Sequence, residues 1–189
     1  MGVTVHFYAF DPRVHTAGTT IERLVADGAL DHELNVLGSD RGLTAIESRL
    51  GDNKRWNDNL AGDHAWDRAR EHVEPVARAG LDAWFSHLFW DRTGQGCPCG
   101  REPVIVAEGE VIFDDALIGH ILSLGCPLAP VEPALAAEFE GDPPRTERLD
   151  RPWIYDFDLF SNLVAEHQQV FTDARKAGPG WHLLRWVWT

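Results

Sequence analysis

Hydrophobic and polar residues alternate at both ends of the chain, which is the pattern of a β-strand with one buried face. In the opening segment MGVTVHFYAF, the alternating sets are Val3, Val5, Phe7 and Ala9 on one side and Thr4, His6, Tyr8 and Phe10 on the other. This period of two predicts a strand that ends at Asp11 and Pro12. The closing segment WHLLRWVWT predicts another strand. The runs PVIV and VIF around AEGE predict a hairpin that turns at Glu108 and Gly109.

Apolar residues recur every three to four positions between these strands, which predicts helices. Thr20 is expected to cap a helix that ends at Gly28, and Asp114 or Asp115 to cap another. Further helices are expected from the Leu43, Ile46 and Leu50 spacing up to Gly51, from Asp63 with a kink at Pro75, from Leu81 to Phe89, and from about Asp158 to Ala177.

Strands at both ends and in the middle, separated by helices, predict an α+β fold. We expect a single domain over residues 1–189, with a small mixed β-sheet that includes both termini and has helices packed on it. The proline-rich and acidic segment 127–152 is expected to form an extended excursion rather than a linker, because the rest of the chain after it is too short for a second core.

Three segments of the chain resemble one known family. The opening MGVTVHFYAF, the helix that ends in GHILSLGCPLAP, and the closing helix followed by an aromatic strand are similar in order and character to the YfbM-like family of uncharacterised bacterial proteins. The resemblance covers about half of the chain. It implies a fold and a bacterial origin, and it implies no catalytic residues.

The charge of the chain narrows the classes of partner. Thirty acidic residues against seventeen basic ones give a formal net charge of -13, which argues against nucleic-acid binding because phosphate contacts need Lys and Arg. The same charge favours a basic protein partner, although an acidic surface also serves solubility. No apolar run reaches the roughly 18 residues of a membrane span, and the start lacks a signal peptide. We therefore expect a soluble, cytoplasmic protein whose three cysteines are reduced.

The tryptophan-rich segment DAWFSHLFWDRTGQGCPCG, residues 82–100, is the first candidate for chemistry. His87 and Asp91 are four residues apart on the predicted helix, so the carboxylate can orient the imidazole and raise its pKa. Such a pair can serve as a general base. The alternative is a surface contact beside Trp90, which packs under a loop.

The cysteines are a second candidate. Cys97, Cys99 and Cys126 with His87 or His120 contain the ligand types of a Cys₃His zinc site, but a one-residue spacing is shorter than structural zinc sites use. The alternative is a tight glycine-rich loop in which small buried thiols fill space. No cofactor is predicted.

The first and last strands supply a third candidate, an aromatic wall. If the two strands are neighbours, one face carries the side chains of His6, Tyr8, Phe10, His182, Leu184, Trp186 and Trp188. We add Trp90, from the central helix, to this wall. An aromatic wall of this kind occurs in three settings, and all three stay open here: the core beneath a helix, the lining of a small-molecule pocket, and a protein interface.

No phosphate loop, nucleophile elbow or H-E-x-x-H motif occurs in the sequence. The leading hypothesis is a binding or regulatory protein, such as an immunity-type inhibitor of a basic toxin. The alternative is a small enzyme with a His/Asp/Cys site, with or without a metal. Whether the chain is an enzyme, which partner or ligand it takes, and its oligomeric state stay open at this point.

Overall fold

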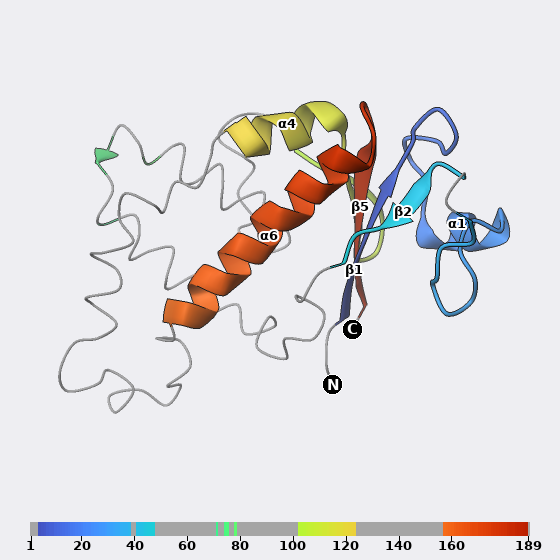
Figure 1. The fold of residues 1–189 in the computed structure, drawn as a ribbon, viewed down its shortest axis with the longest axis horizontal. Helices are drawn as coiled ribbons and strands as arrows, with labels where there is room; N and C mark the ends of the chain where they lie inside the picture. The colour runs from blue at the N-terminus through green and yellow to red at the C-terminus, as the bar shows by residue number, and fades with distance from the viewer. Residues whose placement is uncertain are drawn as a thin grey trace. The chain divides into compact units, whose positions relative to one another are not determined.

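The computed structural model describes residues 4–38, 41–47, 71, 74, 75, 78, 102–123 and 157–188 (Figure 1). The chain divides into two compact units, one of residues 1–54, 101–123 and 166–189 and the other of residues 55–100 and 124–165. Nearly all of the described side chains belong to the first unit. The expectation of a single domain stays a prediction, and the proline-rich segment 127–152 lies outside the described residues.

The described elements are five strands and three helices. In chain order they are β1 (Thr4–Phe10), α1 (Ile21–Ala26), β2 (Leu43–Ala45), β3 (Val104–Ala107), β4 (Glu110–Phe113), α4 (Asp115–Ser123), α6 (Phe157–Ala177) and β5 (His182–Trp188). The first strand, the central hairpin, the last helix and the closing strand lie where the sequence pattern predicts them. None of the helices in this described part is long and apolar enough to cross a membrane.

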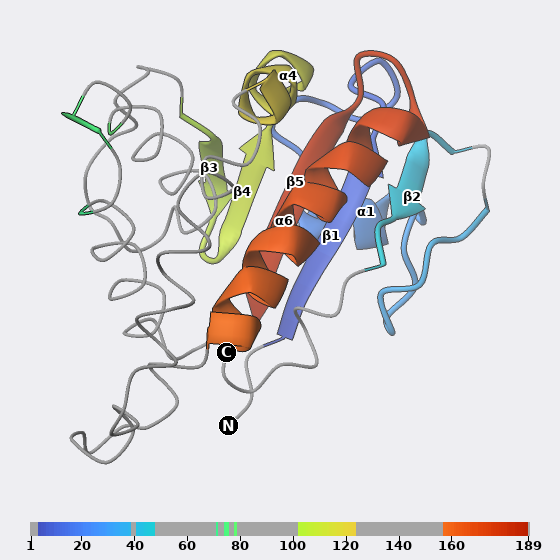
Figure 2. The same ribbon diagram turned by 60° about the vertical axis from the view of Figure 1, so that its left-hand side comes forward.

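The strands form one sheet in the order β2-β1-β5-β4-β3 (Figure 2). β5, the last strand of the chain, lies between β1 and β4 and is antiparallel to both. The α+β class and the participation of strands from both ends are confirmed. All pairings between described strands are antiparallel, so the mixed character expected of the sheet is not found among them. The reason is that strand direction alternates along the order: β1 and β4 run one way, and β2, β5 and β3 run the other.

Short polar side chains start two of the helices, as the sequence predicts. The Thr20 hydroxyl accepts a hydrogen bond of 3.2 Å from the Arg23 N–H at the start of α1. The Asp114 carboxylate accepts one of 2.6 Å from the Leu117 N–H at the start of α4. Such caps satisfy N–H groups that have no partner inside the helix. After α1 the chain turns at Gly28, whose φ of 68° is in the left-handed region that favours glycine.

The prediction of a helix around Leu43 is wrong, because this segment forms the edge strand β2. Leu43 pairs with Phe10, and the Ile46 N–H donates to the Phe7 carbonyl at 2.8 Å. Pairing with β1 satisfies these backbone groups and buries the Leu43 side chain, which is 1% exposed. A spacing of three residues over so short a segment fits both a helix and a strand. Residues 48–51, which were expected to end the helix, lie outside the described part.

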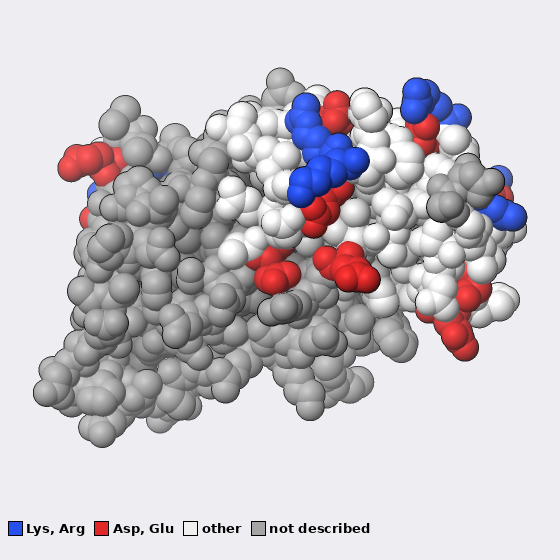
Figure 3. Space-filling view, in the orientation of Figure 1, with Lys and Arg blue, Asp and Glu red and all other residues white. Residues whose placement is uncertain are grey.

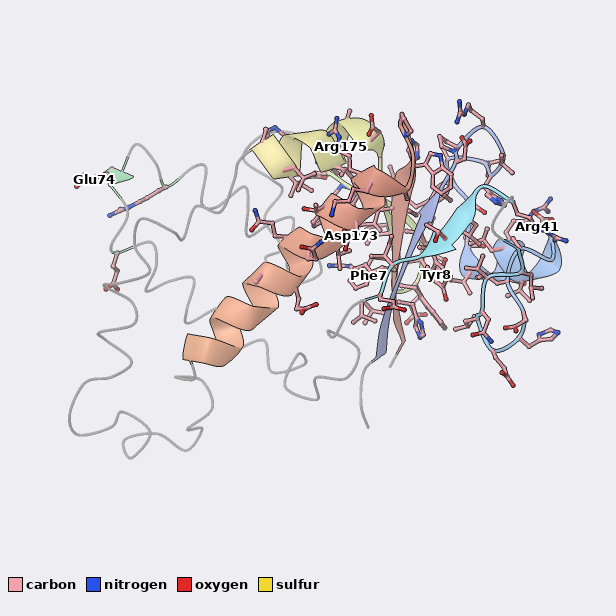
Figure 4. All side chains as sticks on the ribbon, viewed as in Figure 1. Phe7, Tyr8, Arg41, Glu74, Asp173 and Arg175 are labelled. Atoms are coloured by element: carbon pink, nitrogen blue, oxygen red, sulfur yellow. The ribbon has the colours of Figure 1, made fainter. Side chains whose placement is uncertain are left out.

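Helices cover both faces of the sheet. α4 and α6 lie on one face and α1 lies on the other (Figures 1 and 2). Because side chains alternate along a strand, the neighbours Phe7 and Tyr8 of β1 point to opposite faces (Figure 4). On the face of α4 and α6, the rings of Phe113 and Phe171 meet edge to face with centroids 5.1 Å apart. Two layers of core therefore enclose the sheet.

The core on the α1 face is a defined cluster. It consists of Tyr8, Phe10, Ile21, Leu24, Ala29, Leu30, Leu43, Ile112 and Leu184, with Val25, Leu34, Val36, Val106 and Trp186 packed against it half-buried. α1 and the segment after it, up to Val36, cover this core.

The opposite face contains a buried cation, Arg185, whose guanidinium carbon lies 5.9 Å from the centroid of the Phe113 ring. This distance permits a cation–π interaction.

Candidate functional site

The aromatic wall predicted from the first and last strands has the expected register. β1 and β5 are neighbours, and His6 lies opposite Trp186, Tyr8 opposite Leu184, and Phe10 opposite His182. Residues that lie directly opposite each other in adjacent strands share one face of a sheet. Thr4 lies opposite Trp188, and of the Trp188 side chain nothing is described. Trp90 lies outside the described residues.

The centre of this wall is core. The side chains of Tyr8, Phe10 and Leu184 are at most 2% exposed and pack beneath α1. The Tyr8 hydroxyl donates a hydrogen bond of 2.9 Å to the Leu34 carbonyl. Burial, with a smaller contribution from the charge of Asp31, raises the pKa of Tyr8 to about 12. This tyrosine therefore remains protonated and fixes the segment after α1 to the sheet.

One end of the wall is less covered. His6 and Trp186 are half-buried there, and their rings stack with centroids 5.3 Å apart and planes at 27°. The His6 ring is also nearly parallel to the Tyr8 ring, at 6.4 Å. Burial lowers the pKa of His6, so its imidazole stays neutral near pH 7.

Glu110, in the next strand, continues the same row. It lies opposite Trp186 in β4 and is only 7% exposed. Its carboxylate accepts a hydrogen bond of 2.8 Å from the Ile21 N–H, the first residue of α1. Burial raises the pKa of this carboxyl group, although the hydrogen bond from Ile21 partly opposes the shift. Glu110 thus connects the start of α1 to the sheet.

Sequence reasoning missed Glu110. In the run AEGEVIF, this glutamate precedes three apolar residues, and it was treated as part of the hairpin turn. The indication was its alternation with Ile112, since residues two apart in a strand share a face. Both are buried. An acidic residue at such an inward position requires a donor, which α1 supplies.

The opposite end of the wall holds two histidines around Phe10. The rings of His15 and His182 meet the Phe10 ring edge to face, with centroids 6.4 and 5.5 Å from it. His15 Nε2 lies 2.8 Å from the Arg41 carbonyl oxygen, which holds the loop before β2. The Nδ1 atom of His182 is buried, and no hydrogen bond to it is found within the described part.

The other predicted site residues cannot be assembled into a catalytic or metal site from the described residues. His87, Asp91, Cys97, Cys99 and Cys126 all lie outside them. His120 lies in α4 and is half-buried. Within the described ranges, no three His, Cys, Asp or Glu side chains are grouped so that they can hold a metal ion. The acid–base and metal hypotheses therefore stay predictions.

The outer strand β3 presents an apolar surface that sequence reasoning did not single out. Val104 and Ile105 are 59% and 65% exposed. Val104 pairs with Ile112 and Ile105 with Val111, so these two side chains lie on opposite faces of the sheet. Among the described strands, β4 is the one partner of β3, and its other edge has none. Exposed apolar residues on an edge strand mark a place where another strand can pair.

Charged side chains lie at several separate places on the described surface (Figure 3). Near the C-terminal end of α6, Lys176 contacts Asp173 at 3.0 Å, and the guanidinium of Arg175 lies against Gly119 of α4 (Figure 4). Lys and Arg lie next to Asp and Glu over this part of the molecule (Figure 3). The two charged residues that the structure describes next to the ends of β3 are both acidic: exposed Glu102 precedes the strand and exposed Glu108 comes after it.

Comparison with protein families, with curated proteins and with solved structures found nothing that matches this chain. The resemblance to the YfbM-like family therefore stays a prediction.

Proposed function

We propose that this protein binds a basic protein partner in the cytoplasm and regulates it, in the manner of an immunity-type inhibitor of a basic toxin. The observation that carries the proposal is the net charge of -13. A field of this sign speeds the encounter with a basic protein and suppresses acidic ones.

The burial of the aromatic wall favours binding of a protein partner over binding of a small molecule in a pocket. Tyr8, Phe10 and Leu184 are buried against α1, so the centre of the wall has no space for a ligand unless α1 moves. Recognition then takes place on the outer surface, where the acidic side chains are. At the β3 edge this surface combines acidic residues with exposed apolar ones, which is the composition of a protein interface that has both an apolar centre and a polar rim.

The test is the salt dependence of association with a purified partner. The partner is identified by chemical cross-linking in the cell that produces this chain, and the association rate of the purified pair is measured by stopped flow. We expect a partner with a net positive charge, and an association rate that falls about tenfold or more between low and high salt, because exposed charges are screened over about 10 Å at 0.1 M. A partner without net positive charge, or a rate that salt does not change, contradicts the proposal.

One observation favours a second candidate function, the binding of a small molecule. The half-buried rings of His6 and Trp186 lie in the same row as the buried Glu110 carboxylate, and pockets combine aromatic walls with a few polar groups. A ligand at this end of the wall shifts the imidazole proton signals of His6 in NMR spectra. A basic protein partner bound elsewhere leaves these signals in place.

A further inference from the structure

We infer that the basic partner binds by adding an extended strand to the outer edge of β3. This inference rests on the proposed function and names the surface and the kind of segment that it uses. The strand that fits has apolar residues at its centre and Lys or Arg at its ends.

The backbone of β3 gives the first part of the argument. β3 is the last strand of the described sheet on this side, so its outward N–H and C=O groups have no strand partner within the described residues. An added strand satisfies such groups by the same hydrogen bonds that join strands within a sheet. The register shift between Ile105 and Ala107 interrupts the regular edge. The added strand is therefore short, and side chains must contribute to its selectivity.

The side chains of β3 give the second part. Val104 and Ile105 are more than half exposed and lie on opposite faces of the sheet. A single added strand covers both of them, because its own side chains alternate between the same two faces. A helix or a loop that docks on one face covers only one. The exposure on both faces thus favours a strand as the occupant.

The charges at the two ends decide between a second copy of this chain and a basic partner. In an antiparallel pair of two β3 strands centred on Ile105, Glu102 of each copy lies near Glu108 of the other. In a parallel pair, each glutamate lies near its own counterpart. Both arrangements bring like charges together, which destabilises cross-strand pairs. A strand with Lys or Arg at its ends converts the same positions into attractive pairs.

The experiment uses the full chain and three synthetic peptides, with affinity measured by isothermal titration calorimetry. The first peptide has a central run of Val, Ile and Thr with lysines at both ends. The second has the same centre with glutamates at both ends. The third keeps the lysines but has prolines at alternate central positions, which cannot donate the hydrogen bonds of a sheet. We expect the first peptide to bind, and the other two to bind about tenfold more weakly or not at all.

Substitutions in the chain then locate the site. The double variant Glu102→Lys with Glu108→Lys should reverse the preference, so that the glutamate peptide binds about threefold or more tightly than the lysine peptide. The matched control is Glu33→Lys with Glu47→Lys, which makes the same change in net charge at exposed positions outside the β3 hairpin. We expect this control to keep the preference for lysines.

Three outcomes overturn the inference. They are equal binding of the lysine and glutamate peptides, equal binding of the lysine and proline peptides, and a reversal of preference by the control variant. The proposed function fails on a different result, which is a cross-linked partner that lacks net positive charge or associates at a rate that salt does not change. If a basic partner still binds the Glu102→Lys and Glu108→Lys variant at full affinity and with strong salt dependence, the proposed function stands but β3 is not its site.

Discussion

The two edge strands of the described sheet differ in the burial of their apolar side chains. At the β2 edge, the Leu43 side chain is buried. The Asp11 N–H donates a hydrogen bond of 2.7 Å to the Gly42 carbonyl. His15 Nε2 lies within hydrogen-bond distance of the Arg41 carbonyl oxygen, at 2.8 Å. At the β3 edge, Val104 and Ile105 are exposed, and acidic residues stand at both ends. The comparison shows that strands at the two ends of one sheet can differ in the burial of their apolar side chains. Leu43 of β2 belongs to the core, whereas Val104 and Ile105 of β3 face solvent, where another strand can cover them.

The largest loss of stability is expected from removal of β5, because this strand joins β1 and β2 on one side of the sheet to β4 and β3 on the other. A chain that ends before Trp181 lacks β5, which lies at the centre of the sheet. It loses Leu183 and Leu184, both fully buried. Truncation of one such side chain typically costs about 2–5 kcal/mol, against a total stability of about 5–15 kcal/mol. We expect no cooperative thermal unfolding by circular dichroism. A cooperative transition near that of the full chain would show that β5 is peripheral.

A pair of matched alanine substitutions tests the difference between the edges. Leu43→Ala should lower the free energy of unfolding by about 2–5 kcal/mol, because it leaves a cavity in the core of the α1 face. Ile105→Ala should change it by about 0.5 kcal/mol or less, because the side chain is mostly in water already. Urea unfolding measures both. If Ile105→Ala costs as much as Leu43→Ala, the β3 edge is covered in solution and the comparison fails.

A smaller change in the free energy of unfolding is expected from substitution of Glu110, which lies in β4, the strand paired with β3. Its raised pKa means that the folded state binds the proton more readily than the unfolded state. Its contribution to stability is therefore fully present below the unfolded pKa of about 4.3 and is lost as the pH rises through the folded pKa. Glu110→Gln keeps an acceptor for the Ile21 N–H and removes the ionisation. This variant should be more stable than the natural chain at pH 7, and the difference should vanish below about pH 4.

The control for this prediction is Glu108→Gln, which removes a carboxylate from an exposed position on the same hairpin. Urea unfolding at a series of pH values gives the difference between each variant and the natural chain. A Glu110→Gln variant that is less stable than the natural chain at pH 7 would mean that the charged carboxylate stabilises the start of α1.

Most of the described fold was accessible to sequence reasoning because the relevant patterns are local. Alternation identified β1 and β5, and the turn at Gly109 identified the hairpin. Thr20 was predicted as a cap, and of the two candidates Asp114 and Asp115 the structure shows Asp114 as the second cap. The failure at Leu43 has a physical cause. A short edge strand has too few residues to show a period, and its conformation is set by pairing with a strand more than 30 residues earlier.

The candidate site was accessible only in part. The register of the aromatic wall was predictable from alternation once β1 and β5 were neighbours. The hydrogen-bond donor of Glu110 in α1 and the exposure of Val104 and Ile105 were not, because they depend on which elements cover which strand. The run VIVA is apolar enough to predict a buried strand. Its exposure results from its place at the end of the sheet.

The most direct test of the β3 edge is hydrogen exchange of the backbone amides, measured by NMR or mass spectrometry in the free chain and with the lysine-ended peptide. Amides of β5 should exchange slowest in the free chain, because that strand is paired on both sides. The outward amides of β3 should exchange fast when free and become protected when the peptide is added, while those of β2 remain unchanged. Outward β3 amides that are already as protected as those of β5, or protection by the peptide at β2 instead, would contradict the account.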